Sequence, residues 1–193
     1  MARNAEASRA EIYRAATAEF ARYGIAGARM DRIAQTAGFN KNLIYLYFGN
    51  KEQLLEAVMA GYSEQLHEAA PLNAGDLAGY ATALFDFMLA HPDLVRLSTW
   101  SALEGRQLST RAKGLYEAKL AKIIVGQARG QIRRELAPSA VLSLVNAIAT
   151  AWTVGTFGVG VSEVSPIDPA DQRAAIAAGV RNLLMTETGG KNA

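Results

Sequence analysis

Apolar residues recur every three or four positions along most of the chain, which is the spacing of amphipathic helices. The first such segment covers about residues 7–23, and its apolar face consists of Ile12, Ala16, Phe20 and Tyr23. Gly24 follows directly and is predicted to end this helix, because glycine adopts the left-handed conformation easily. A second, short helix is predicted over about residues 29–36, with an apolar face made of Met30, Ile33, Ala34 and Ala37.

The next segment, FNKNLIYLYF at residues 39–48, combines aromatic rings, amides and a lysine. An isolated helix of this length is marginal in water, so packing against the rest of the protein must hold it. Gly38 permits a sharp turn before it, and the Asn40 side chain is placed to cap a helix that begins there. We predict a third helix whose polar groups face outward and whose inner side consists of Phe39, Ile44 and Phe48.

The remaining chain also carries helical patterns, which glycine and proline interrupt. Helices are expected over about residues 52–66, 76–90, 93–104, 109–128, 138–157 and 169–186. A valine-rich stretch near residues 154–161 is the one competitor for a strand. The sequence therefore predicts an all-α fold of about nine helices, followed by a disordered tail at residues 189–193.

Composition and charge narrow the class of protein. The chain has 193 residues, half of them apolar, and it has no cysteine, which excludes a disulfide scaffold and a thiolate zinc site. It has no apolar run of about 18 residues and no signal-peptide pattern, so we expect a cytoplasmic protein without a membrane segment. Residues 1–52 carry eight Lys or Arg against five Asp or Glu, whereas the rest carries twelve against thirteen. This basic front favours a polyanion as partner, although ordinary scatter in charge would look the same.

Two short helices joined by a glycine-containing turn form a helix-turn-helix, whose second helix enters the major groove of DNA. The segment MDRIAQTAGFNKNLIYLYF at residues 30–48 has this form. Lys41 can reach a guanine edge or a phosphate, and Asn42 can pair with an adenine edge. The hydroxyls of Tyr45 and Tyr47 can bind phosphate, and an apolar side chain such as Leu46 can contact a thymine methyl.

Three motifs cover roughly residues 9–60: A-x-x-x-F-x-x-x-G, I-A-x-x-A-G and I-Y-x-Y-F-x-x-K-E-x-L-L. With them, this region resembles the N-terminal domain of TetR-family transcriptional regulators. The resemblance implies that the residues in contact with DNA are Lys41, Asn42, Tyr45, Leu46, Tyr47 and Lys51. Arg29 and Lys51 flank the reading helix near helix N-termini, where phosphate is also favoured, and Asn40 precedes that helix as a further candidate. Arg29 stands where the family usually has a Ser or Thr cap, and Asn40 replaces the commoner Ser, which leaves the nature of their DNA contacts open.

The resemblance further implies that residues from about 72 onward bind a small molecule and dimerise through the last two long helices. The segment 138–157 is apolar over most of its circumference, so it requires burial on several sides. The segment 169–186 carries Ile176, Val180, Leu183 and Leu184 with small residues between them. We expect these two helices from each of two chains to form a four-helix dimer interface. The alternative is that both helices cap a monomeric core.

An effector pocket is predicted near the centre of this second domain. Its candidate residues, several of which could instead be ordinary core, are Phe85, Met88, Trp100, Glu104, Tyr116, Trp152 and Phe157. Trp100 and Glu104 are four residues apart and could present a carboxylate beside an indole, or Glu104 could be solvated.

The segment 111–134 is rich in cations that do not share one stripe, so we interpret them as a solvated helix face rather than a second polyanion site: Arg111, Lys113, Lys119, Lys122, Arg129, Arg133 and Arg134.

Together these features predict a dimeric, ligand-responsive transcriptional regulator, most often a repressor in this family, that binds a palindromic operator in double-stranded DNA. Residues 1–51 are expected to form the DNA-binding domain, the helix at 52–66 to connect, and residues 67–188 to form the effector-binding and dimerisation domain. We expect no cofactor, no metal and no enzymatic activity, because the sequence contains no catalytic or metal-binding motif. The main alternative is a helical-bundle ligand carrier or enzyme with a non-functional DNA reader. A regulator that binds another protein rather than a small molecule is the second.

Overall fold

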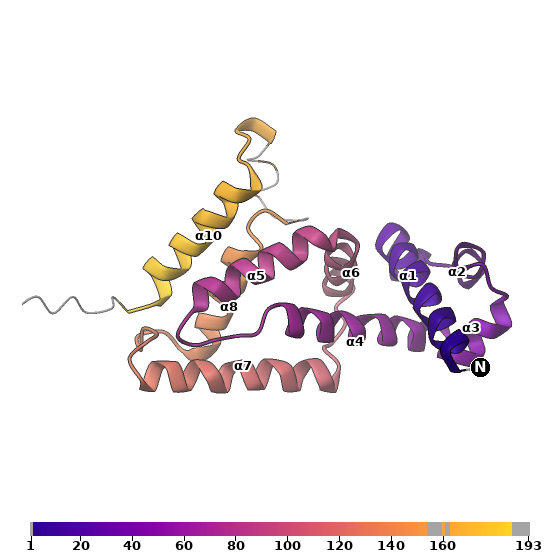
Figure 1. Cartoon of the computed structure of the whole chain (residues 1–193), viewed down its shortest axis with the longest axis horizontal. Coiled ribbons are helices and arrows are strands. Elements are labelled where there is room, and N and C mark those ends of the chain that lie inside the picture. Colours follow the sequence, from indigo (N-terminus) through magenta and orange to yellow (C-terminus); the bar gives the residue numbers. More distant parts are fainter. Residues whose placement is uncertain (1, 154–159, 161–162, 187–193) are drawn as a thin grey trace, which may run out of the picture. The chain divides into compact units, whose positions relative to one another are not determined.

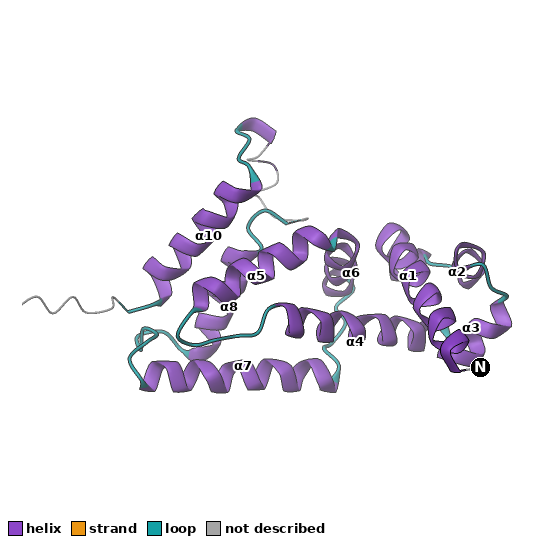
Figure 2. Ribbon diagram, in the orientation of Figure 1, coloured by secondary structure: helices purple, strands orange, loops and turns teal. Residues whose placement is uncertain are grey.

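The structure is a computed structural model that describes residues 2–153, 160 and 163–186. Within these residues it contains nine named helices and no strand, apart from an isolated antiparallel bridge between Ile132 and Met185 (Figure 2). The prediction of an all-α fold is therefore confirmed. Every described helix is either too short or too polar to span a membrane.

The chain divides into two compact units, of which the first consists of Met1–Glu64 and His91–Ser109. It contains α1 (Ala2–Gly27), α2 (Met30–Ala37), α3 (Lys41–Phe48), the first part of α4 (Lys51–Ala69) and α6 (Pro92–Leu103) (Figure 1). Helix α1 packs against α2 and α6, and α2 packs against α3. The predicted domains instead place residues 91–109 with the C-terminal part, and that functional division stays a prediction.

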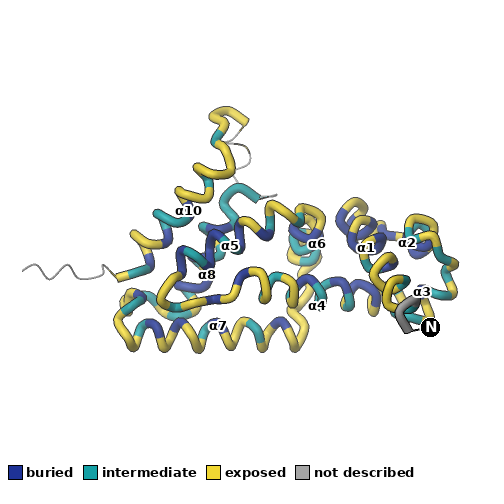
Figure 3. Tube along the Cα trace, viewed as in Figure 1, coloured by how far each residue is buried: buried dark blue, intermediate teal, exposed yellow. Residues whose placement is uncertain are grey.

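The apolar face of α1 forms the centre of the first unit. Ile12, Ala16 and Phe20 are fully buried, as their spacing predicts. Figure 3 shows that buried and exposed positions alternate along α1. Tyr23 differs from the prediction because it is 42% exposed, and the centroid of its ring lies 4.1 Å from the guanidinium carbon of Arg32. Gly24 has φ 70°, so the helical run breaks there, as the sequence predicts.

The second unit consists of Gln65–Ala90 and Thr110–Ala193. Its main helices are α5 (Leu77–Ala90), α7 (Thr110–Ala128), α8 (Pro138–Ala149) and α10 (Pro169–Leu184). Helix α5 packs against α8 and α10, and α8 also packs against α7 and α10. Eight of the 14 residues of α5 are buried, so α5 is the central helix of this unit.

Helix α8 is shorter than the sequence predicts. The expected helix continued to about Phe157, but α8 ends at Ala149, and the prediction is wrong for residues 150–153. The Thr150 hydroxyl donates to the carbonyl of Asn146 at 2.9 Å, and the Ala151 N–H bonds to the carbonyl of Ile148 in a tighter turn. Phe157 and the tail at residues 189–193 lie outside the described residues.

Candidate functional site

The turn between α2 and α3 is held by backbone hydrogen bonds and one side-chain cap. Gly38 adopts the left-handed conformation at φ 74°, ψ 24°, which suits glycine, and the Phe39 N–H donates to the carbonyl of Ala34 at 3.0 Å. Asn40 Oδ1 accepts a hydrogen bond from the Leu43 N–H at 2.8 Å. The predicted cap is confirmed, so the start of α3 is fixed relative to α2.

Helix α3 has one inner and one outer side. Ile44 is fully buried in the core of the first unit, and Phe39 and Phe48 pack against that core. Tyr45 and Asn42 are exposed, and Leu46 is 76% exposed. This is the orientation that the sequence predicts for Asn42, Tyr45 and Leu46, but Tyr47, which was also expected on the outer side, is partly buried and packs against the core.

The cations of this surface have partners on neighbouring helices. Lys41 Nζ lies 2.8 Å from Asp31 Oδ1 on α2, and this hydrogen bond raises the pKa of Lys41 above its ordinary value. Arg9 of α1 donates to the carbonyl of Tyr47 at 3.3 Å, and its guanidinium lies 5.8 Å from the centroid of the Tyr47 ring. Arg9 is therefore an additional cation beside α3. The sequence gives no signal for this contact because it joins positions 38 residues apart.

The N-terminus of α2 is fixed by a buried carboxylate from α1. Arg29 is exposed, and its side chain does not cap α2. Glu19 Oε1 instead accepts hydrogen bonds from the Arg29 N–H and from Arg32 Nε, each at 2.8 Å. Glu19 thus takes the place of the Ser or Thr cap that is usual in the family, and neither Glu19 nor Arg32 was predicted from the sequence.

Lys51, a predicted phosphate ligand, is engaged within the protein. Its Nζ donates to the carbonyls of Ile25, Ala26 and Ala28 at 3.0, 3.3 and 3.4 Å. These bonds use all three donors of an ammonium group. The side chain therefore ties the beginning of α4 to the turn that precedes α2.

The predicted effector residues fall into different parts of the structure. Phe85 is buried in the core of the second unit, and Met88 and Trp152 pack against that core. Tyr116 is exposed on α7. Trp100 lies on α6, and Glu104 is the C-terminal cap of that helix, so both belong to the first unit. The Trp100 ring lies against Gly24. Phe157 lies outside the described residues, and the effector role of all seven stays a prediction.

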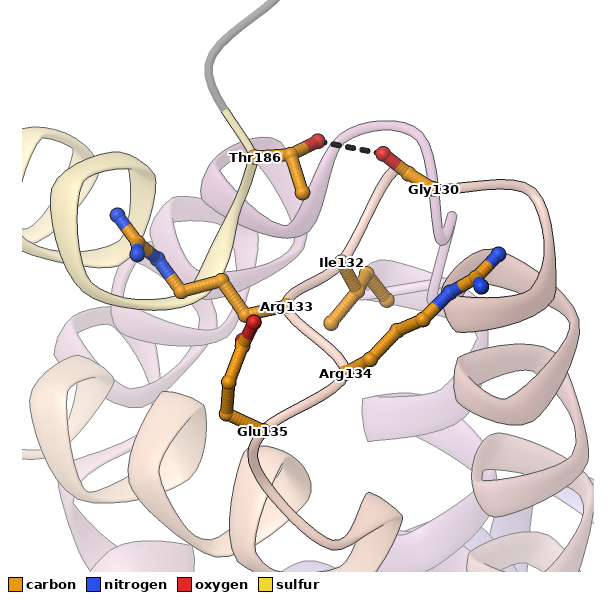
Figure 4. Close-up of a pocket in the computed structure, with 6 residues that line it drawn as sticks. All are labelled: Gly130, Ile132, Arg133, Arg134, Glu135 and Thr186. Carbon is orange, nitrogen blue, oxygen red and sulfur yellow. Dashed lines mark hydrogen bonds between the residues drawn. The ribbon is translucent and has the colours of Figure 1, made fainter.

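A pocket of about 340 Å³ in the second unit contains none of these candidates. Figure 4 shows its lining, which consists of Gly130, Ile132, Arg133, Arg134, Glu135 and Thr186. Arg134 donates to the carbonyls of Gln127 and Ala128 at 2.7 Å, and Arg133 donates to that of Asn182 at 3.2 Å. Both arginines thus cap the C-terminal ends of helices, where a cation is favourable.

Lys119 contradicts the interpretation of the α7 cations as a solvated face. Lys113 and Lys122 are exposed, but Lys119 is buried. Its ammonium faces the interior because it donates to the hydroxyl of Tyr80 on α5 at 3.1 Å.

Two regions of the chain match known families. Residues 3–58 match the family described as bacterial regulatory proteins, tetR family, and residues 76–182 match the tetracyclin repressor-like C-terminal domain. The chain is 41% identical over 157 residues to the HTH-type transcriptional repressor SCO4008 of Streptomyces coelicolor, which covers 79% of this chain and 81% of that protein. It is 31% identical over 153 residues to the HTH-type transcriptional repressor NicS of Pseudomonas putida, with 70% of each chain covered.

Solved structures give the same result for the fold. The transcriptional regulator SCO4942 of Streptomyces coelicolor aligns with a TM-score of 0.82 at 37% identity, covering 92% of this chain and 98% of that one. A regulator from Marinobacter aquaeolei aligns with a TM-score of 0.76 at 18% identity, covering 96% of this chain and 99% of that one. Because the sequence identity is only 18%, the alignment with the Marinobacter structure supports the fold and no functional conclusion.

Proposed function

The chain belongs to the TetR family of transcriptional regulators, and on that premise we propose that it is a repressor that binds operator DNA as a homodimer and is released by a small-molecule effector. The observation that carries the proposal is the outer side of α3. Buried Ile44 and the Asn40 cap fix the helix, and polar groups and Leu46 extend from its exposed side. Both curated relatives described above are repressors rather than enzymes, which favours repression over the carrier or enzyme alternative.

Each exposed group on this surface has a role that its chemistry suits. Asn42 pairs with an adenine edge, and Leu46 contacts a thymine methyl in the major groove. Lys41, Arg29 and the hydroxyls of Tyr45 and Tyr47 bind phosphate. We assign Lys51 and Asn40 mainly a supporting role, because both already bind backbone groups that position α2 and α3.

The proposed dimer interface lies on α8 and α10. Leu144 and Ile148 of α8 are only partly buried, although that helix is strongly apolar, and Leu183 of α10 is 51% exposed. A second chain that covers these groups would complete their burial. A two-fold dimer would then present two copies of α3 to successive major grooves, about 34 Å apart or a multiple of that.

The oligomeric state tests this interface. Leu183→Glu is expected to convert the dimer to a monomer in light scattering, because a carboxylate would be buried at the seam. Ile124→Glu is the matched control, since Ile124 is 54% exposed on α7. If Ile124→Glu dissociates the dimer and Leu183→Glu does not, the interface lies on α7 and the proposed interface is wrong.

Release by the effector requires two conformations of the dimer that differ in affinity for DNA. The effector shifts the population only through its own affinity difference between these two states.

A DNA-binding regulator acts where the chromosome lies, so we place the protein in the cytoplasm.

A mobility-shift assay tests the function as a whole. The full chain should retain a duplex taken from the DNA beside its own gene and should release an unrelated duplex as salt increases. A reporter under that promoter should become more active when the gene is deleted. Equal retention of both duplexes at every salt concentration, with an unchanged reporter, would contradict the proposal.

A further inference from the structure

The side chain of Lys119 is buried in the second unit, with 9% of its surface exposed. Its Nζ donates to Tyr80 Oη of α5 at 3.1 Å, and that hydroxyl donates in turn to Asn146 Oδ1 of α8 at 3.1 Å. The ammonium also lies 5.0 Å from the centroid of the Tyr80 ring and 5.9 Å from that of Tyr116. A chain of hydrogen bonds therefore runs from Lys119 of α7 through Tyr80 of α5 to Asn146 of α8.

The charge of this cation has no partner of opposite sign among the described residues. Burial of an ammonium is unfavourable unless an anion pairs with it. The ion pairs of Arg14, Arg32, Lys41 and Arg173, by contrast, each join a cation to a carboxylate. Burial and the nearby ammonium of Lys122 lower the pKa of Lys119, whereas burial raises the pKa of Tyr80 and keeps its hydroxyl protonated.

The hydrogen-bond donors of this cluster are only partly used. An ammonium has three N–H donors, and the bond to Tyr80 uses one of them. The remaining donors can bind the two oxygens of a carboxylate, and such charge-assisted bonds are stronger than neutral ones. By contrast, the arginines of the pocket in Figure 4 are exposed, so water already solvates their charge and that pocket is a poorer anion site.

Apolar residues border the polar cluster around Lys119. Ile123 lies one turn further along α7 and is fully buried, and Leu142 and Val145 of α8 belong to the same core. Tyr116 lies one turn before Lys119 and is exposed, so the ring that lies 5.9 Å from the ammonium also borders solvent. A ligand for this place combines one anionic group with an apolar body.

We propose that Lys119, supported by Tyr80 and Asn146, is the anion-binding centre of the effector site, and that the effector is a monocarboxylate with an apolar body. The inference rests on the proposed function in one respect, namely that the second unit binds an effector. A carboxylate at Glu104, beside Trp100, would instead suit a cationic or hydroxylated effector.

Thermal unfolding of the full chain tests the ligand class directly. The probes are benzoate and octanoate, each compared with its neutral amide, benzamide or octanamide, at constant ionic strength. A carboxylate at ten times its Kd should raise the Tm by roughly 3–6 °C for a chain of this size, and the amide should raise it much less. If neither carboxylate stabilises the wild-type chain more than its amide does, the proposal is wrong.

Two variants locate the binding site. Lys119→Met removes the charge and keeps an apolar chain of similar length, and Lys119→Gln keeps a hydrogen-bond donor but removes the charge. Both should lose the difference between carboxylate and amide, whereas Lys113→Met should keep it, because Lys113 is exposed on the same helix. Lys119→Met without ligand should unfold at or above the wild-type Tm, because an unpaired buried charge has been removed. Undiminished stabilisation of both Lys119 variants by carboxylate would overturn the proposal.

DNA binding distinguishes this proposal from the proposed function. If the wild-type chain retains the duplex from beside its gene and benzoate or octanoate releases it, Lys119→Met should still retain the duplex but resist release. A chain that binds carboxylate through Lys119 but binds no DNA would contradict the proposed function and leave the anion site intact. Release from Lys119→Met at the wild-type carboxylate concentration would contradict the anion site.

Discussion

The role of Lys41 can be tested through the salt dependence of DNA binding. In the free protein its ammonium lies 2.8 Å from Asp31, and both side chains are exposed to solvent. An exposed ion pair is weak, so a phosphate can displace the carboxylate. We predict that Lys41→Gln weakens binding and also makes it less sensitive to salt, because one phosphate contact per protomer is lost.

The size of this effect follows from counterion release. Each phosphate contact contributes about 0.9 to the slope of log K against log salt concentration, so a dimer that loses two contacts loses about 1.8. Between 50 and 200 mM salt, the wild type should therefore lose roughly 12-fold more affinity than Lys41→Gln does. Asp31→Asn should have the opposite effect on affinity, because phosphate then no longer competes with a carboxylate for Lys41.

Fluorescence anisotropy with a labelled duplex from beside the gene measures these slopes. Lys113→Gln is the matched control, since it removes an exposed lysine from α7 in the second unit. Its slope should equal that of the wild type. If Lys41→Gln has the wild-type slope and loses affinity for one sequence only, Lys41 binds a base edge and the phosphate assignment is wrong.

Three further predictions concern the support of α3. Asn40→Ala should lower the free energy of unfolding by about 1 kcal/mol in urea titrations, because it removes the bond from Asn40 to the Leu43 N–H; an unchanged midpoint would show that the cap is unimportant. Ile44→Ala should lower it by about 2–5 kcal/mol and abolish operator binding, since Ile44 is fully buried, and unimpaired DNA binding would contradict the packing argument. Lys51→Met should lower the Tm but leave the salt slope unchanged, because its ammonium binds three carbonyls; a flatter slope would restore Lys51 as a phosphate ligand.

The features of the fold that depend on local sequence could be predicted. The period of apolar residues predicted α1 to α3, and the chemistry of Gly38 and Asn40 predicted the turn and the cap between α2 and α3. The same local rules predicted the outer side of α3 for Asn42, Tyr45 and Leu46 but not for Tyr47, which packs against the core. These features need only the spacing of side chains and the preferences of single residues.

Contacts between distant segments could not be predicted in this way. The bond from Arg32 to Glu19 and the bonds from Lys51 to the carbonyls before α2 join residues 13 to 26 positions apart. Periodicity also placed Lys119 among solvated cations, because nothing local to α7 shows that Tyr80 of α5 faces it. The end of α8 was misjudged because Thr150 bonds back to its own helix, which apolar spacing does not show.

Photocrosslinking gives the most direct test of the claim that the outer side of α3 contacts DNA. Leu46 and Leu103 are 76% and 75% exposed and belong to the same unit, on α3 and α6 respectively. Benzoylphenylalanine introduced at each position should give opposite results with a labelled duplex from beside the gene. The account predicts a crosslink from position 46 and none from position 103. A crosslink from position 103 alone, in chains that both still bind the duplex, would contradict it.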